Sequence, residues 1–333
     1  GEMKIMNNLV ILPILIPFIT ATILLFIPRK IQLQKGISVV SLSLTSIAAF
    51  LLVQSVYVNG IQTLEVGSWK PPFGIVLVAD MFAALLVLTG IVVSFACILF
   101  SFKGIGAERE KYYYYAFTHF LITGVMGAFL TGDMFNLFVF FEVMLIASYV
   151  LIVIGGTKIQ MRESLKYVLI NIVSSGLFVV ALAYLYGIMG TLNIADLSAK
   201  IADVGQTGLL TVVAILFLIV FGLKGGIFPL YLWLPGSYQA PPYAITALFG
   251  GLLTKVGVYA IFRTFSTIFY HEPQITHMII GVLAIITILI GAIGAIAYWD
   301  VKKILIYNIV TAVGVIVFGV AIATETGYAG AIF

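Results

Sequence analysis

The feature that most constrains this chain is an apolar stretch, Leu209–Pro235, which is long enough to cross a bilayer and yet contains a lysine. An ammonium group at membrane depth costs roughly 2.5 to 3.5 kcal/mol on insertion scales, so Lys224 requires a partner, a water-lined cavity or a function. Gly225, Gly226 and Pro229 follow it directly. Such residues weaken or break a helix, and unwound backbone at this depth must face protein or a wet cavity. We therefore predict a broken helix in which Lys224 faces the protein interior.

The composition indicates a polytopic membrane protein. With 62% hydrophobic and 9% charged residues, the chain lacks the polar surface that a soluble domain of 333 residues needs. Its long apolar runs predict an all-α transmembrane helical bundle and not a barrel of short alternating strands. Because the chain has one cysteine, Cys97, and three scattered histidines, we expect no cofactor, no metal and no redox centre of its own. The net charge of +4 is spread over short loops, which indicates a topology signal and no nucleic-acid partner.

Apolar runs predict ten membrane spans and the start of an eleventh, with the break in the seventh. They lie near residues 9–28, 37–58, 80–102, 112–131, 133–154, 165–190, 208–232, 243–265, 276–298 and 303–323, and the eleventh begins near Tyr328. Between the second and third spans, the polar segment Asn59–Ala79 predicts a short hairpin that caps one face. The apolar spacing of Leu192–Val204 predicts an interfacial amphipathic helix.

The distribution of basic residues predicts the orientation. If the first loop is cytoplasmic, that side carries eleven of them: Arg29, Lys30, Lys35, Lys103, Arg109, Lys111, Lys158, Arg162, Lys166, Lys302 and Lys303. The opposite side carries four: Lys4, Lys70, Lys200 and Arg263. This positive-inside bias predicts a multi-pass protein of the cell membrane with its N-terminus outside.

Three ionisable residues are predicted to lie inside the membrane, on three different helices: Glu142, Lys224 and Lys255. Glu142 follows Asp133, at the start of its span, by nine residues, which is about 14 Å along a helix and close to the bilayer midplane. One interpretation is a structural ion pair between Glu142 and Lys224, with Lys255 extending toward water. The other is a proton or cation path, in which the carboxylate switches the lysine between holding and releasing its proton. Buried ion pairs seldom repay their desolvation, which favours the path.

Other polar residues at depth could hold a water wire between these charges. They are Thr118, His119, Asn171, Ser174, Ser175 and Thr254. Each also has a simpler interpretation, because Ser and Thr in membrane helices usually bond their own backbone and His119 can be a packed histidine. No carboxylate-rich cluster for a hard cation is visible in the membrane, which leaves open whether a cation crosses this chain at all.

Three segments resemble one known family. The run Lys224–Arg263, with its Trp-Leu-Pro at 233–235 and paired prolines at 241–242, resembles the signature of the proton-translocating antiporter-like subunits shared by respiratory complex I and the Mrp-type multisubunit cation/proton antiporters. The segment around Glu142 is similar to the glutamate-bearing fifth helix of that family, and Ala297–Gly314 resembles its Asp-x-Lys-Lys segment. Of these two groups of proteins, the Mrp-type antiporters are the ones whose signature residues this segment most resembles.

The resemblance implies roles for these residues. Glu142 and Lys224 would form the modulating pair and Lys255 would pass the proton on. The polar residues at depth and the helix break add supporting candidates from the sequence itself: His119, Gly225, Pro229, Ser174 and Thr254. It implies other subunits of a hetero-oligomeric antiporter as partners, besides membrane lipid, and protons and Na⁺ or another monovalent cation as cargo. Alternatives are a proton-pumping, non-redox subunit of NADH-quinone oxidoreductase (complex I) or of a membrane-bound hydrogenase, and a scaffold subunit whose charges only fix packing.

The same resemblance predicts the organisation of the chain. Residues 1–111 would be an N-terminal three-helix region with an extracytoplasmic hairpin, and residues 112–265 a five-helix proton-translocating repeat. Residues 266–333 would start a second, inverted repeat. Because the chain opens Gly1-Glu2-Met3 and stops as an eleventh span begins, we expect it to be a fragment of a longer protein.

Overall fold

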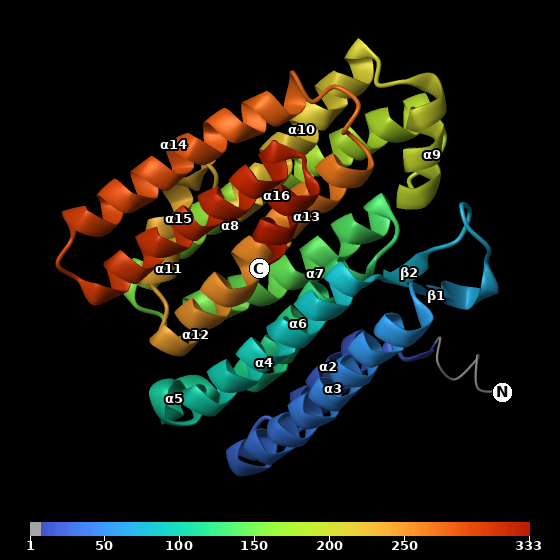
Figure 1. The fold of residues 1–333 in the computed structure, drawn as a ribbon. Helices are drawn as coiled ribbons and strands as arrows, with labels where there is room; N and C mark the ends of the chain where they lie inside the picture. Colours follow the sequence, from blue (N-terminus) through green and yellow to red (C-terminus); the bar gives the residue numbers. More distant parts are fainter. Residues whose placement is uncertain (1–7) are drawn as a thin grey trace. The chain divides into compact units, whose positions relative to one another are not determined.

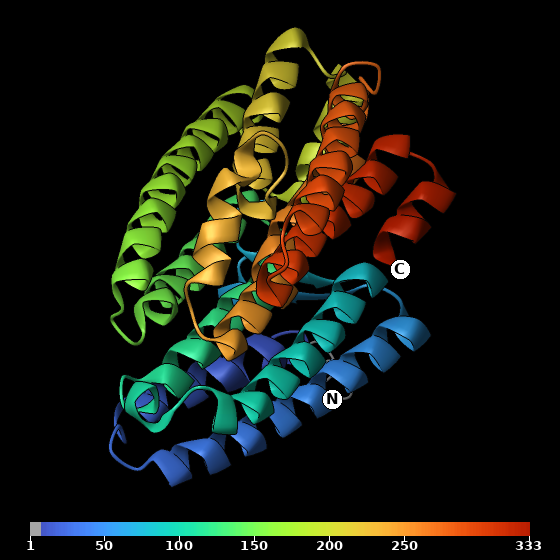
Figure 2. The same cartoon turned by 90° about the vertical axis from the view of Figure 1, so that its left-hand side faces the viewer.

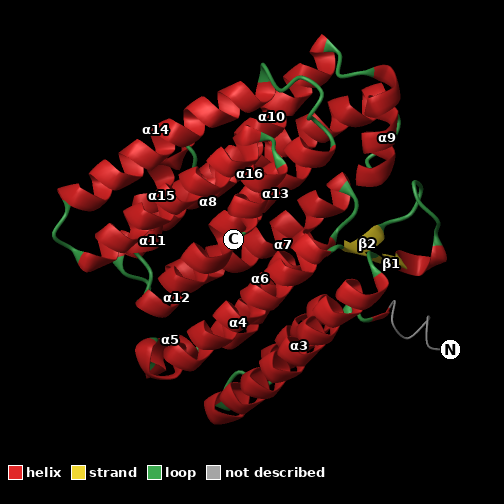
Figure 3. Cartoon of the chain, viewed as in Figure 1, coloured by secondary structure: helices red, strands yellow, loops and turns green. Residues whose placement is uncertain are grey.

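The computed structural model describes residues 8–333, which are almost entirely helical (Figures 1 and 3). Lys4 and the opening residues 1–3, which entered the predictions above, lie outside the described residues. The chain forms two compact units. Unit 1 comprises the described residues up to Ser164 together with Ala240–Leu252, and unit 2 comprises Leu165–Gln239 and Leu253–Phe333.

Helix α6 is the central element of unit 1, since α2, α4 and α7 all pack against it. Glycines allow the close approach of α7. A β-carbon at Gly124 would lie 2.6 Å from the backbone nitrogen of Met144, and one at Gly127 would overlap the ring of Phe140. The helices of this unit are α2 Leu12–Leu25, α3 Ile31–Asn59, α4 Met81–Gly104, α5 Ala107–Glu110, α6 Tyr114–Leu130, α7 Met134–Val153 and α12 Tyr243–Leu248.

The predicted hairpin between the second and third spans is confirmed. Strand β1, Gln62–Glu65, pairs antiparallel with β2, Val76–Ala79 (Figure 3). The hairpin is joined to the turn between α6 and α7, because the Gly132 amide donates to the Val76 carbonyl at 2.8 Å. It therefore covers one end of the spans that meet at this turn.

Unit 2 contains most of α8 and all of the later helices except α12. Its helices are α8 Lys158–Met189, which begins in unit 1, α9 Ile194–Val204, α10 Gly208–Gly225, α11 Leu234–Gln239, α13 Thr254–Thr267, α14 Thr276–Ala297, α15 Val301–Ile322 and α16 Glu325–Ile332. Helices α14 and α15, orange and red in Figures 1 and 2, pack along their length. Gly291 and Gly294 permit this, because β-carbons there would overlap Thr311 and Tyr307.

The amphipathic helix predicted at 192–204 is confirmed as α9. Leu197 and Ile201 are buried, and the Asn193 side chain caps the first turn by accepting from the Asp196 amide at 3.1 Å. The other face carries a salt bridge of 3.0 Å between Lys200 and Asp196, and this lysine lowers the pKa of Asp196.

Among the described residues, eight helices are long and apolar enough to cross a membrane, and α2 and α6 are shorter apolar helices. These elements coincide with the ten predicted spans, and the chain is a multi-pass membrane protein. Near the start predicted for an eleventh span lies the short helix α16, Glu325–Ile332. It is not among the helices that are long enough to cross a membrane, so the eleventh span stays a prediction.

Two spans begin earlier than predicted. Helix α3 starts at Ile31 and not near residue 37, because Gln34 and Lys35 are not loop residues but lie in the helix and are held by hydrogen bonds. Helix α8 starts at Lys158 and not near residue 165, since Gln160 braces the turn before it.

Candidate functional site

Lys224 lies in the last turn of α10 and is 5% exposed, so it faces the protein interior as predicted. Its Nζ donates a hydrogen bond to Oδ1 of Asn171 on α8. The amide of Asn171 is oriented by its own Nδ2, which donates to the Tyr167 carbonyl at 2.7 Å. The carbonyl end of α10 adds a favourable field for positive charge at this position. The Asn171 amide and the end of α10 therefore both favour the ammonium at this position.

The predicted break follows Lys224 directly. Gly226 adopts a left-handed conformation with φ of +79°, and the amides of Gly226 and Ile227 donate to the Gly222 carbonyl at 2.9 and 3.0 Å. Helical structure resumes after Pro229, first as the 3₁₀ segment Leu230–Trp233 and then as α11.

Two side chains bind backbone groups at the break. The indole Nε1 of Trp233 donates to the Leu223 carbonyl at 2.9 Å, and the Phe228 amide donates to Oγ1 of Thr287 at 2.9 Å. Unwound backbone inside a membrane protein requires such partners. Trp233, the first residue of the Trp-Leu-Pro motif, thus binds the end of α10.

Lys255 lies on the helix that packs against this break. A β-carbon at Gly257 of α13 would lie 2.8 Å from the backbone carbonyl carbon of Lys224, so this glycine allows the two helices to touch. Lys255 is partly buried in the first turn of α13. Because residues two apart differ by about 200° around a helix, Lys255 lies on a different face of α13 from Gly257. The structure places the two lysines on neighbouring helices of unit 2.

A π-helical segment, Phe249–Leu253, precedes Lys255 and was not predicted. It interrupts the eighth span, which is therefore divided into α12 and α13. Such segments are common at functional sites because they shift the following side chains around the helix axis. The paired glycines Gly250 and Gly251 are the sequence feature that could have indicated this interruption of the helix.

Glu142 is partly buried near the middle of α7 in unit 1. The start of this helix is fixed by Asp133, whose carboxylate accepts from the Asn136 amide at 2.8 Å, and desolvation raises the pKa of Asp133. Asp133 therefore marks the span end, as predicted. Since Lys224 belongs to unit 2, the pairing of Glu142 with Lys224 stays a prediction.

The supporting residues have different environments. His119 is fully buried in α6, with Nδ1 2.8 Å from the Tyr115 carbonyl and, among residues 8–333, no partner for Nε2. Ser174 is buried and donates to the Val220 carbonyl of α10 at 3.4 Å. Thr254 is fully buried beside Lys255, whereas Thr118 bonds the Tyr114 carbonyl of its own helix. Within the described part of the chain, no group of three His, Cys, Asp or Glu residues could hold a metal ion.

Two contacts of buried lysines were not predicted from the sequence. Asn171 was grouped with residues that could hold water, but it binds Lys224 directly. The sequence feature that could have predicted this contact is an amide at membrane depth, because an amide accepts from an ammonium without adding charge. Lys302 was counted as a loop charge, but it is 8% exposed and its Nζ donates to the Gln239 carbonyl at 2.8 Å, at the end of α11. Gln239 in turn donates to Asp300 at 3.1 Å. The Asp-x-Lys-Lys segment therefore anchors the second part of the broken helix.

The chain is a multi-pass helical protein with a buried lysine at the end of a broken helix, an arrangement typical of membrane transport proteins. Residues 131–333 match the family model described as NADH:quinone oxidoreductase/Mrp antiporter, TM, and the chain belongs to this family. It is 57% identical over 328 residues to a curated Na(+)/H(+) antiporter subunit from Bacillus subtilis (strain 168). That alignment covers 98% of this chain and 66% of the relative.

Solved structures agree with this assignment. The Mrp complex from Dietzia sp. DQ12-45-1b contains a chain that superposes with a TM-score of 0.91 at 30% identity, covering 98% of this chain and 61% of that one. The membrane-bound sulfane sulfur reductase, an archaeal respiratory membrane complex, contains one with a TM-score of 0.89 at 30% identity, covering 98% and 68%. The family resemblance and the helical fold predicted from the sequence are confirmed.

Proposed function

We propose that this chain is part of a membrane subunit of a multisubunit antiporter, which exchanges Na⁺ or another monovalent cation for protons across the cell membrane. The N-terminus lies outside in this proposal. Residues 112–265 form the proton-translocating repeat and residues 266–333 begin the second one. Glu142 modulates Lys224, and Lys255 passes the proton on. The partners are the other subunits of the hetero-oligomer.

The observation that carries this proposal is the hydrogen bond between Lys224 and Asn171 inside unit 2. The Oδ1 of an amide can accept from a charged ammonium and also from a neutral amine, because both carry N–H groups. A carboxylate at the same place would favour only the charged lysine. Asn171 therefore suits a lysine that alternates between its two protonation states, which is what proton transfer requires.

The names of the relatives support the same conclusion. The Bacillus subtilis relative is named as a subunit of a Na(+)/H(+) antiporter, and one solved relative belongs to an Mrp complex. Since the chain spans 66% of the length of the curated relative, the activity is proposed for the full-length protein within its complex.

The test is Lys224→Arg in the full-length protein. Arginine keeps the positive charge but does not deprotonate, so we expect assembly to persist. Sodium-dependent proton flux in inverted membrane vesicles should fall on the order of 100-fold, the size typical for loss of a positioned proton-transfer group. Lys200→Arg, at an exposed salt bridge of α9, is the matched control and should transport normally. Normal flux in Lys224→Arg would instead support the scaffold interpretation.

A second candidate is the proton-pumping arm of a redox complex, favoured by the match to a respiratory membrane complex. The same buried lysines would serve both functions, so substitutions do not separate them. Purification of the full-length protein with its native partners, followed by mass spectrometry, does. Partners that carry iron–sulfur or flavin centres would indicate the redox complex, whereas small membrane subunits without them would indicate the antiporter.

A further inference from the structure

A pocket of about 480 Å³ lies in unit 1, at one end of its membrane helices. Its lining residues come from the α4–α6 connection and from the turn that joins α7 to α8: Gly106, Ala107, Glu108, Arg109, Tyr112 and Gly155. Because α4 ends at Gly104 and α7 ends at Val153, the pocket lies where these two apolar helices finish. This is the position at which lipid head groups meet a membrane protein.

Arg109 supplies the positive charge of the pocket. Its Nη1 donates to the Ile105 carbonyl at 3.2 Å, but its Nε is buried and has no hydrogen-bond partner anywhere in residues 8–333. A guanidinium carries five N–H donors in a planar fork, and a buried donor without an acceptor is unfavourable. Because Nε is covered by the protein itself, an anion in the pocket would meet the Nη end of the guanidinium.

The α7–α8 turn is shaped to leave room for this guanidinium. Gly155 has a φ of +110°, and a β-carbon there would lie 2.7 Å from Nε of Arg109. Gln160, which is 1% exposed, fixes the turn. Its Nε2 donates to the Ile154 carbonyl at 2.7 Å, and its Oε1 accepts from the amide and hydroxyl of Thr157 at 3.1 and 3.0 Å. The turn is thus rigid where it faces Arg109.

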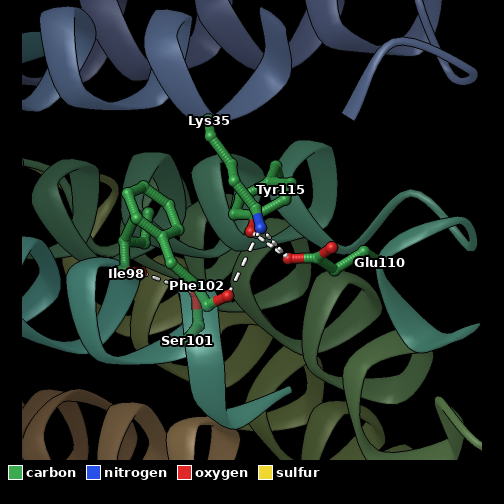
Figure 4. A network of polar contacts seen from close by, with 6 residues as sticks. All are labelled: Lys35, Ile98, Ser101, Phe102, Glu110 and Tyr115. Carbon is green, nitrogen blue, oxygen red and sulfur yellow. Dashed lines mark hydrogen bonds and ion pairs between the residues drawn. The ribbon is translucent and has the colours of Figure 1, made fainter. Parts of the chain in front are cut away.

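The other side of Arg109 is anchored through the next residue (Figure 4). Glu110 forms a salt bridge of 2.8 Å with Lys35 and accepts a hydrogen bond of 2.7 Å from the Tyr115 hydroxyl. Lys35 also donates to the Phe102 carbonyl at 3.3 Å. Because α5 is held in this way, the arginine is positioned before any ligand arrives, which reduces the entropic cost of binding.

We propose that the Arg109 pocket binds the phosphate of an anionic phospholipid head group. Guanidinium and phosphate pair through two parallel charge-assisted hydrogen bonds, and basic pockets at helix ends are suited to such head groups. The carboxylate of Glu108, which also lines the pocket, is engaged with Lys111 at 3.3 Å. The occupant is a lipid and not a free anion, because the pocket lies at the end of two membrane helices.

The test uses the full-length protein in its native complex, reconstituted in nanodiscs with defined mixtures of phosphatidylglycerol and phosphatidylcholine. Lipids that stay bound are counted by native mass spectrometry. We expect the wild type to retain phosphatidylglycerol, and Arg109→Gln to weaken this retention by roughly tenfold or more, the loss expected for a charge-assisted pair. Lys103→Gln removes an exposed basic residue of α4 that does not line the pocket, and it should change retention less than roughly twofold.

Two outcomes would overturn the proposal. Equal retention of phosphatidylglycerol by the wild type and Arg109→Gln would show that the arginine does not bind the head group. Displacement of the lipid by millimolar inorganic phosphate would show a site for free anions. If Arg109→Gln does not assemble, Arg109→Lys keeps the charge but removes the planar guanidinium that can pair with phosphate through two hydrogen bonds, and it should also weaken retention. Unchanged retention of phosphatidylglycerol by Arg109→Lys would also count against binding of the head group by the guanidinium.

Discussion

Two lysines of this molecule are held in opposite ways. In unit 1, Lys35 lies in the continuous helix α3, where Glu110 pairs with it at 2.8 Å and Tyr115 completes the carboxylate's contacts. In unit 2, Lys224 lies at the end of a broken helix and donates to the neutral amide of Asn171. An ion pair stabilises only the charged lysine, whereas an amide accommodates both protonation states. The comparison separates a lysine in a described ion pair from one that contacts a neutral amide, and in the proposed function only the second exchanges a proton.

The largest effect is expected when Lys224 is given the partner type of Lys35. Asn171→Asp places a carboxylate where the amide accepts from the lysine, so Lys224 should stay charged and transfer protons slowly. We expect sodium-dependent proton flux to fall on the order of 100-fold in vesicles, with normal assembly. Asn59→Asp, at the exposed end of α3, is the matched control. Wild-type flux in Asn171→Asp would remove the basis of the comparison.

Glu142→Gln tests whether the proposed carboxylate partner of Lys224, which lies in unit 1, controls the protonation of this lysine. If Glu142 approaches Lys224 during the transport cycle, the two form a transient ion pair. Glu110 and Lys35 form such a pair in the structure itself. The amide cannot tune the lysine, so we expect flux to fall by roughly tenfold to a hundredfold while the complex assembles. Glu325→Gln, at the exposed start of α16, should be silent in the same assay. Normal transport by Glu142→Gln would leave Glu142 with a purely structural role.

The sequence predicted the architecture well because hydropathy alone fixes membrane helices. The ten spans, the hairpin, the amphipathic helix and the break after Lys224 all follow from apolar runs and from Gly and Pro. Polar residues near span ends were harder to interpret. Lys35 and Lys302 were assigned to loops, and both are instead held inside the fold. Charge counting gives the same weight to a solvated lysine and to one that has a buried partner.

The sequence predicted which charged residues are buried at the candidate site, but not which residues they contact. Burial of Lys224 followed from its position in an apolar stretch, but its bond to Asn171 depends on how α8 packs against α10. The π segment before Lys255 depends likewise on tertiary packing, since π-helical turns have no distinctive composition beyond the two glycines here. Local pattern therefore identifies the charges, and only packing identifies their partners.

Lys35→Met tests the structural member of the comparison. Removing one partner of a buried ion pair costs about 3 to 5 kcal/mol, and we expect about 2 to 3 kcal/mol here because the lysine side chain is 17% exposed. The thermal unfolding midpoint of the detergent-solubilised complex should fall, while flux per assembled complex stays normal. Lys103→Met, an exposed residue near the end of α4, is the control. A variant that melts normally but loses flux would show that Lys35 belongs to the transport path.

The smallest effect concerns the closure of the helix break at Lys224. Trp233→Phe keeps the ring that packs 5.3 Å from Tyr167 but removes the N–H that binds the Leu223 carbonyl. An unpaired buried acceptor costs about 1 to 3 kcal/mol, so the unfolding midpoint should fall modestly and flux should decline with it. Trp69→Phe, in the hairpin segment and 70% exposed, controls for the loss of an indole. If both variants melt like the wild type, the break is closed by the Gly226 turn and not by the indole.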